Sequence, residues 1–572
     1  MNAVLLIILA IVIFVVAYLT YGRYLAKTWG IDPSNTTPAH EMEDGVDYVP
    51  AKAPVLMGHH FSSIAGAGPI NGPIQAAFFG WVPVFLWIVI GGIFFGAVQD
   101  FGSILVSIRH KGMSLGEVIE ENIGHRCKVL FTVFAWLVLL LVVAAFADIV
   151  ASSFTIVDPS VSTANGSVAT ASILFIPLAI LFGFCVYRKN VPMGIASVVG
   201  VILLAVCVGV GLACPLNLPK NFWLGFVFVY IMIASVTPVW ILLQPRDYLS
   251  SFLLYFMIIA AVVGIIGAHP TVETAAFTGF TVGNNYLFPT LFITVACGAV
   301  SGFHSLIGSG TTSKQLDNEK DALAIGYGSM LIECVLAVIS LIAIGTLSAN
   351  GTYGASAAEG ALASDGVTLL SSLASPTVVF ATAISGFFAK IGLGATAVKA
   401  TYTVIALAVS AFCLTSLDTA TRLGRFMFQE LFAGKDGKKN ILSNMYVATV
   451  ITAGLGFVLC LAGYAKVWPL FGACNQLVAV PAFLAIAVYL ARVGKKNWML
   501  YFPMVFMLCA TLSSMALTFK NNVQKLMAGT GSVMTEGLQC VIIIPVAILA
   551  ILLVIEGVSA LARVKKEKAA SK

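Results

Sequence analysis

Charge is scarce in this sequence. Only 10% of its 572 residues are charged, whereas 59% are hydrophobic. Soluble globular domains carry about 25% charged residues, so this composition excludes a water-soluble enzyme. One membrane helix needs only about 20 apolar residues. Because apolar runs cover most of the chain, we expect an integral membrane protein that crosses the bilayer many times.

Motifs for several kinds of chemistry are also missing. The 11 cysteines include no C-x-x-C pair, so we interpret them as buried packing residues and not as metal or disulfide sites. Ser313 stands where a phosphate loop needs Gly before Lys314, and no other segment offers a nucleotide site. We therefore expect no cofactor, no metal site, no enzymatic activity and no drive by ATP. The net charge of +6 is too small to imply a nucleic-acid partner.

Apolar runs with the length of a membrane helix are bounded by Pro, Gly, Asn or charged residues throughout the chain. They cover 3–25, 54–75, 80–108, 128–156, 168–187, 192–213, 221–243, 249–268, 288–310, 321–349, 395–417, 442–463, 467–491, 498–519 and 537–561. This pattern predicts an all-α polytopic membrane protein with about 15 transmembrane helices. A further run, 371–389, is short and contains three Ser and one Pro. It is either another span or a half-inserted segment.

The distribution of Lys and Arg bears on that choice. If 371–389 does not cross, 25 of the 31 Lys and Arg residues fall on one side of the membrane. The other side keeps Lys220, Lys390, Lys399, Lys466, Lys520 and Lys525. Cytoplasmic loops are enriched in Lys and Arg, so this split predicts an N-terminus outside the cell and a cytoplasmic C-terminus. Counting 371–389 as a span would reverse every later loop and spoil the split.

One predicted span contains residues that break helices. The segment 58–73 reads GHHFSSIAGAGPINGP and holds four glycines and two prolines at membrane depth. Pro removes a backbone donor and Gly weakens the helix, so we expect local unwinding. Lipid cannot satisfy the freed backbone groups. Such an interruption is tolerated only where protein or a watery cavity surrounds it.

A similar segment occurs in the second half of the chain. Ser63–Gly68 aligns with Ser305–Gly310 through the Ser, two Gly and an apolar pair, with a His upstream in each copy. The topology from charge makes the two copies cross in opposite directions. Paired interruptions of this kind are the best sequence pointer to the substrate site of a secondary transporter. The alternative is that the glycines only form close-packing helix faces.

Seven motifs spread over most of the chain carry a resemblance to a known family. They are GHHFSSIAGAGPINGP at 58–73, GAVQDF at 96–101, KGMSLGEV at 111–118, QPRDYL at 244–249, ACGAVSGFHSLIGSGTTSKQL at 296–316, LTSLDTATRLGR at 414–425 and WPLFGACNQLVA at 468–479. The sequence resembles the carbon starvation protein A family of the amino acid, polyamine and organocation transporter superfamily. That resemblance implies a LeuT-like architecture, in which two inverted repeats of five helices each begin with a broken helix. Here the interval holds seven spans, so two spans per half would be peripheral additions.

We accordingly expect one integral-membrane transporter domain over 1–572. It would consist of an extra N-terminal helix at 1–25, repeats at 54–268 and 288–561, and a basic cytoplasmic tail at 562–572.

The interruptions give the candidate substrate site. Imidazole can exchange a proton near neutral pH, and unwound backbone offers N–H and C=O groups to charged ligands. The substrate-binding candidates are His59, His60, Ser62, Ser63, Gly66, Gly68, His304, Ser305, Gly308 and Gly310.

Charges at membrane depth give the candidate coupling site, because an intramembrane carboxylate is costly and by default functional. The ion-coupling candidates are Asp100, Asp148, Glu333 and Asp418, together with the hydroxyls of Thr415, Ser416 and Thr419. Resemblance to the wider superfamily implies that such hydroxyls form a sodium site. The structural alternatives are ion pairs of Asp100 with Arg109 and of Asp418 with Arg422. Arg246 and Asp247 are expected at a cytoplasmic turn, and Asn475 and Gln476 in hydrogen bonds between helices.

These observations together predict a secondary active transporter of the cytoplasmic membrane. It would take up small carboxylate-bearing nutrients by alternating access. The family resemblance implies that these are peptides or pyruvate, taken up during carbon starvation. Protons are the first choice of coupling ion and sodium the second, and the oligomeric state stays open. The alternatives are a channel, a nutrient sensor that does not transport, and an intramembrane enzyme in which His59, His60 and His304 bind a metal.

Overall fold

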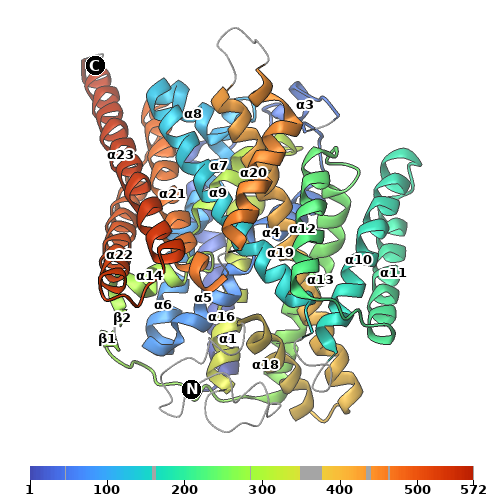
Figure 1. The fold of residues 1–572 in the computed structure, drawn as a ribbon. Helices are drawn as coiled ribbons and strands as arrows, with labels where there is room; N and C mark the ends of the chain where they lie inside the picture. Colours follow the sequence, from blue (N-terminus) through green and yellow to red (C-terminus); the bar gives the residue numbers. More distant parts are fainter. Residues whose placement is uncertain are drawn as a thin grey trace.

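The structure is a computed structural model that describes residues 1–45, 47–156, 163–283, 285–347, 376–432, 440–461 and 464–570. The described residues form a bundle of helices (Figure 1). Within them, one short antiparallel hairpin pairs β1 (Thr281–Val282) with β2 (Asn285–Tyr286). The prediction of an all-α protein is confirmed.

The helices follow one another in this order. They are α1 (Ala3–Ala17), α2 (Arg23–Trp29), α3 (Pro38–Glu41), α4 (Ala53–Ile64), α5 (Gly68–Ala76), α6 (Trp81–Gly91), α7 (Ala97–Arg109), α8 (Leu115–Asn122), α9 (His125–Phe154), α10 (Ala164–Gly183), α11 (Met193–Ala213), α12 (Lys220–Val236), α13 (Leu243–Ala268), α14 (Leu287–Thr294), α15 (Gly302–Gly310), α16 (Ser329–Leu347), α18 (Pro376–Lys390), α19 (Ala395–Phe432), α20 (Met445–Cys460), α21 (Tyr464–Arg492), α22 (Tyr501–Met527) and α23 (Leu538–Ala570).

Eleven helical segments of the described chain are long and apolar enough to cross a membrane. The chain is therefore an integral membrane protein. Each of the eleven overlaps a predicted span. The four other predicted spans correspond to the shorter helices α12 and α20 and to the two interrupted pairs α4/α5 and α14/α15.

The run 371–389 is only partly visible. Residues 371–375 lie outside the described residues, and the remainder forms α18, which packs against α13, α16 and α19. At 15 residues α18 is shorter than the roughly 20 that a span needs. The choice between a span and a half-inserted segment stays open.

The long helices α9 and α19 pack along each other in the middle of the bundle, whereas α11 lies at one edge and α22 and α23 at the other (Figure 1). The outlying helices expose apolar side chains, for example Ile195 and Val198 of α11, which are 61% and 62% exposed. A helix that presents apolar residues outward has the surface that lipid tails require. The buried middle is consequently the place for polar chemistry.

The first predicted interruption is confirmed. Helix α4 ends at Ile64 and α5 begins at Gly68, with three non-helical residues between them. Pro69 lies in the first turn of α5, where a missing N–H removes no helical hydrogen bond. The Gly and Pro content of this segment therefore marks the break correctly.

The second interruption lies upstream of the predicted one, so the prediction was wrong in position. Helices α14 and α15 are separated by residues 295–301, whereas Ser305–Gly310 belong to the regular helix α15. The glycines of α15 serve packing: Gly308 faces Ser103 and Ile104 of α7, and Gly310 faces Leu423 of α19. Helical glycine is tolerated where two helices approach closely. Because 295–301 contain no Pro, the sequence did not reveal the true break.

The two interrupted helices run in opposite directions and meet at their breaks. Ala51, just before α4, pairs with Leu316, just after α15, whereas Gly72 of α5 lies against Thr294 at the end of α14. Between these contacts, a Cβ placed on Gly68 would come 2.3 Å from the Cβ of Cys297. Only glycine allows this approach. The two breaks therefore lie against each other. We call residues 65–68 and 295–301 together the junction.

Gly68→Ala tests this contact. The added methyl group overlaps Cys297, and overpacking of this kind costs about 1–3 kcal/mol. We expect a lower midpoint of thermal unfolding in detergent. A second substitution, Cys297→Gly, should restore the midpoint because it removes the overlapping atoms. If Gly68→Ala alone melts like the parent protein, the two breaks do not touch as described.

Candidate functional site

Three predicted residues come together beside the junction. His304 of α15 lies between Asp100 of α7 and Glu333 of α16, and all three side chains are fully buried. His304 Nδ1 is 3.0 Å from Asp100 Oδ2, a hydrogen bond, and His304 Nε2 is 3.6 Å from Glu333 Oε2, an ion-pair distance. We call Asp100, His304 and Glu333 the proton cluster. The alternative pairing of Asp100 with Arg109 is wrong, because Arg109 binds Glu319.

The composition of the proton cluster suits proton storage. Two carboxylates and one imidazolium would together carry a charge of −1, and an uncompensated buried charge is costly. Asp100 Oδ1 and Glu333 Oε1 have no hydrogen-bond partner among the described residues. One further proton on a carboxylate makes the cluster neutral overall. Binding of one proton therefore removes the net buried charge of the cluster.

The two carboxylates occupy matching positions in the fold. Each follows a π-helical turn, Gly92–Gly96 before Asp100 and Leu323–Gly328 before Glu333. Helix α5 packs against α16, and α15 packs against α7. The half-helix after the first break therefore packs on the helix that follows the second break, and the half-helix after the second break packs on the helix that follows the first. π-Helical turns inside α-helices are frequent at functional sites.

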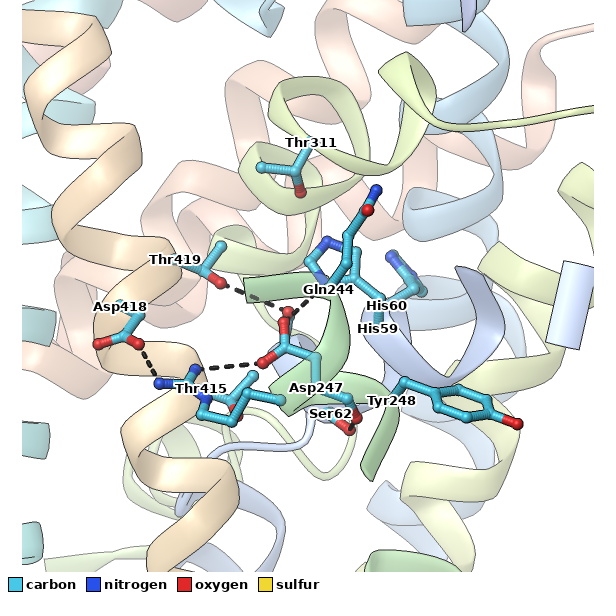
Figure 2. A network of polar contacts seen from close by, with 12 residues as sticks. His59, His60, Ser62, Gln244, Asp247, Tyr248, Thr311, Thr415, Asp418 and Thr419 are labelled. Carbon is cyan, nitrogen blue, oxygen red and sulfur yellow. Dashed lines mark hydrogen bonds and ion pairs between the residues drawn. The ribbon is translucent and has the colours of Figure 1, made fainter. Parts of the chain in front are cut away.

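A second buried cluster contains residues that the sequence placed elsewhere. Arg246 binds Asp418 and Tyr230, and its Nη2 lies 3.1 Å from Asp247 Oδ1. Asp247 Oδ2 in turn lies 2.7 Å from His59 Nδ1. Asp247 lies between His59 on α4 and Asp418 on α19 (Figure 2). We call Tyr230, Arg246, Asp247, Asp418 and His59 the arginine cluster.

The cytoplasmic turn expected at Arg246 and Asp247 is wrong. Both residues lie near the start of α13, inside the helix, and they are 1% and 0% exposed. Burial is possible because Asp418 and Asp247 compensate the guanidinium. The ion pair expected between Asp418 and Arg422 is wrong as well, since Arg422 donates to the carbonyls of Ala234 and Thr237. Charged residues beside a Pro have the sequence pattern of a loop. The partners that allow their burial are distant in the sequence, so the pattern did not reveal them.

The end of α4 brings most of the remaining candidates together. His60 Nδ1 lies 2.8 Å from the Thr312 hydroxyl, and Ser62 donates to the Asp247 carbonyl at 3.3 Å. The Ser63 hydroxyl lies 3.4 Å from that of Thr419.

Helix α19 also holds the first break. Ser416 donates to the Ser63 carbonyl at 2.9 Å, so this hydroxyl satisfies a backbone group freed at the break. Thr415, in contrast, donates to Ala411 of its own helix.

Four predicted residues lie elsewhere or act differently. Asp148 pairs with Lys220 Nζ at 2.8 Å, away from both clusters. The Ser305 hydroxyl donates to the Gly302 carbonyl of its own helix at 2.6 Å. Gly308 and Gly310 lie inside α15, so the prediction that an unwound segment exposes their backbone is wrong.

Helix α21 supplies the groups that satisfy the second break. Asn475 accepts a hydrogen bond from the backbone N–H of Phe303 at 2.8 Å, and Gln476 donates to the Phe292 carbonyl at 2.7 Å. The predicted hydrogen bonds between helices are confirmed. One side chain caps the start of α15 and its neighbour caps the end of α14, which compensates for the missing helical hydrogen bonds. Among the described residues, no group of three or more His, Cys, Asp or Glu is arranged to hold a metal ion.

Comparison with known proteins agrees with this architecture. The carbon starvation protein CstA family matches residues 2–369 and 361–514. The peptide transporter CstA of Campylobacter jejuni is 34% identical, over 89% of this chain and 79% of that protein. The pyruvate/proton symporter BtsT of Escherichia coli is 31% identical, over 91% of this chain and 82% of that protein.

Similarity to solved structures is weaker. A manganese transporter of Eremococcus coleocola aligns with 91% of this chain and 99% of its own, at 12% identity and a TM-score of 0.49, which is too low to carry a conclusion. Family membership follows from the sequence relatives, which match almost the whole chain. The chain belongs to the carbon starvation protein CstA family.

Proposed function

We propose that this protein imports a small nutrient that carries a carboxylate, a peptide or pyruvate, by alternating access. The observation that carries the proposal is the junction, where two antiparallel interrupted helices meet between two buried charged clusters. Half-helix ends at such a junction present partial charges to a ligand. The names of the family relatives support both substrate classes.

The inverted repeat is part of this proposal. Three observations support two related halves. The pairs α4/α5 and α14/α15 are antiparallel, α5 packs on α16 as α15 packs on α7, and α9 pairs with α19 in the middle of the bundle. We place the N-terminus outside and the C-terminus in the cytoplasm. The Lys and Arg distribution supports this orientation, and Met1 and the end of α23 lie at opposite ends of the bundle (Figure 1).

The proton is the proposed coupling ion. The support for this is that His304 is buried between two acids and links α7 to α16 through its two ring nitrogens. Sodium is the second candidate, because Ser63 contacts the Ser416 hydroxyl through its carbonyl and the Thr419 hydroxyl through its own hydroxyl. In this structure Ser416 already donates to that carbonyl, so a sodium ion would have to displace a hydrogen bond.

Uptake into liposomes tests the function. Purified protein should accumulate labelled pyruvate or a labelled dipeptide, with a rate that saturates, when the outside is made acidic. A protonophore should abolish the accumulation. Accumulation that follows only an imposed sodium gradient would assign coupling to the hydroxyl site. Flux that does not saturate and never exceeds equilibrium would indicate a channel, and no flux of either substrate would contradict the proposed function.

A further inference from the structure

A large cavity opens beside the junction at the end of the bundle that carries the β1–β2 hairpin. Its volume is about 830 Å³, and residues of α5, α14, α21 and α22 line it together with the hairpin. This volume is in the range of small-molecule sites, roughly 300–1,000 Å³. We call this cavity the vestibule. Helix α22 contributes the most lining residues, although it contacts neither the proton cluster nor the arginine cluster through any described hydrogen bond or ion pair.

The vestibule is cationic. Lys520 and Lys525 of α22 line it with Asn521 and Gln524, and none of the described lining residues is acidic. Neither lysine forms an ion pair with a described residue. Glu536 is close enough to feel the charge of Lys525, but its carboxylate accepts from Thr535 and from the Ser532 backbone. Two lysines without a paired acid give the vestibule a positive potential that attracts anions.

The vestibule borders the junction, because its lining residue Thr294 directly precedes residues 295–301. Gln75 at the end of α5, Thr294 at the end of α14 and Gly472 of α21 line it. Gly472 is three residues from Asn475, about 4.5 Å along the helix, and Asn475 caps the start of α15. The part of the vestibule wall formed by Gly472 is therefore less than one helical turn of α21 from Asn475, which stabilises the second break.

We propose that the vestibule is a reception site for small carboxylates, in which Lys520 and Lys525 concentrate the anion before it reaches the junction. The inference rests on the proposed transport function and on the orientation that places this end of the bundle outside. It gives a role in substrate capture to α22, a helix that makes no described hydrogen bond or ion pair with either cluster. The lysines lie on exposed positions, so they act by attraction and not by a rigid bidentate contact.

The double variant Lys520→Gln, Lys525→Gln tests the reception site. The matched control is Lys390→Gln, Lys399→Gln, which removes the same charge from two exposed lysines on the same predicted side but outside the vestibule. Initial uptake of labelled pyruvate is measured in liposomes at several concentrations and at low and high ionic strength. We expect the vestibule variant to raise KM about fivefold at low salt with kcat unchanged. Because salt screens exposed charges, high ionic strength should raise the parent's KM toward that of the variant.

The outcomes separate the two proposals. If the parent protein transports and the vestibule variant has the KM and salt dependence of the control variant, the reception site is wrong and the transport function stands. If the parent protein transports neither pyruvate nor a dipeptide, the proposed function fails first. A fall in kcat without a change in KM would place the lysines in the transport step and overturn a role in capture.

Discussion

Glu333→Gln should lower the accumulation of substrate that an acidic outside drives by about 10²-fold. A loss of this size is typical when an acid–base group is removed. The amide keeps the size of the side chain but cannot exchange a proton, so it holds the buried cluster permanently in its neutral form. Exchange of labelled for unlabelled substrate across the membrane should survive, because it needs no net proton movement. Asp100→Asn should behave in the same way.

One other acid provides a control for this experiment, and a second tests a further coupling candidate. Glu556 lies in α23, at the edge of the bundle, and Asp148 pairs with Lys220 away from both clusters. Glu556→Gln should leave both accumulation and exchange intact. Asp148→Asn measures whether that carboxylate belongs to the coupling machinery, as the sequence suggested. Normal proton-driven accumulation by Glu333→Gln would remove the proton cluster from the mechanism.

The second large effect is expected from Arg246→Met. This change leaves Asp247 and Asp418 as buried carboxylates without their shared cation, and breaking a buried ion pair in this way costs about 3–5 kcal/mol. We expect a clear loss of thermal stability in detergent together with loss of uptake. Arg563→Met, a change at an exposed position in α23, is the control and should leave both properties unchanged.

A second substitution separates stability from transport. Arg246→Met with Asp418→Asn removes one uncompensated charge, so much of the lost stability should return. Uptake should stay low, because the guanidinium that joins α13 to α12 and α19 is still absent. Recovery of uptake along with stability would show that the arginine cluster only holds the fold together.

The sequence was sufficient where composition decides the structure. The scarcity of charge predicted a membrane protein, and each long apolar run corresponds to a helix. Gly and Pro at 65–69 located the first break because both residues weaken a helix directly. Local properties of the chain are enough for such conclusions.

The second break required information that a local pattern does not contain. Residues 295–301 hold a single glycine and no proline, and they unwind because Asn475 and Gln476 replace the lost helical hydrogen bonds from a helix far along the chain. The similar letters at Ser305–Gly310 had a different cause, close packing on α7 and α19. The predicted position of the second break was therefore wrong, although the prediction of two breaks that meet was right.

The candidate site was predictable in its members but not in its grouping. His304, Asp100 and Glu333 were each selected as costly or titratable groups at membrane depth, and the fold brings them together. Arg246 and Asp247 were missed as buried residues because a charged pair next to Pro245 has the pattern of a loop. The motif QPRDYL was a signal, but only the fold shows that Asp418 and His59 lie beside it.

The ring of His304 connects two contacts that respond differently to motion. Glu333 is on α16, in the same half of the chain as α15, whereas Asp100 is on α7 in the other half. If α15 and α16 shift together against α7, the distance from Nδ1 to Asp100 changes and the distance from Nε2 to Glu333 is preserved. The distances from this single imidazole to the two carboxylates would then depend differently on the relative position of the halves. Nitrogen-15 chemical shifts of its two ring atoms would report conformation and protonation separately.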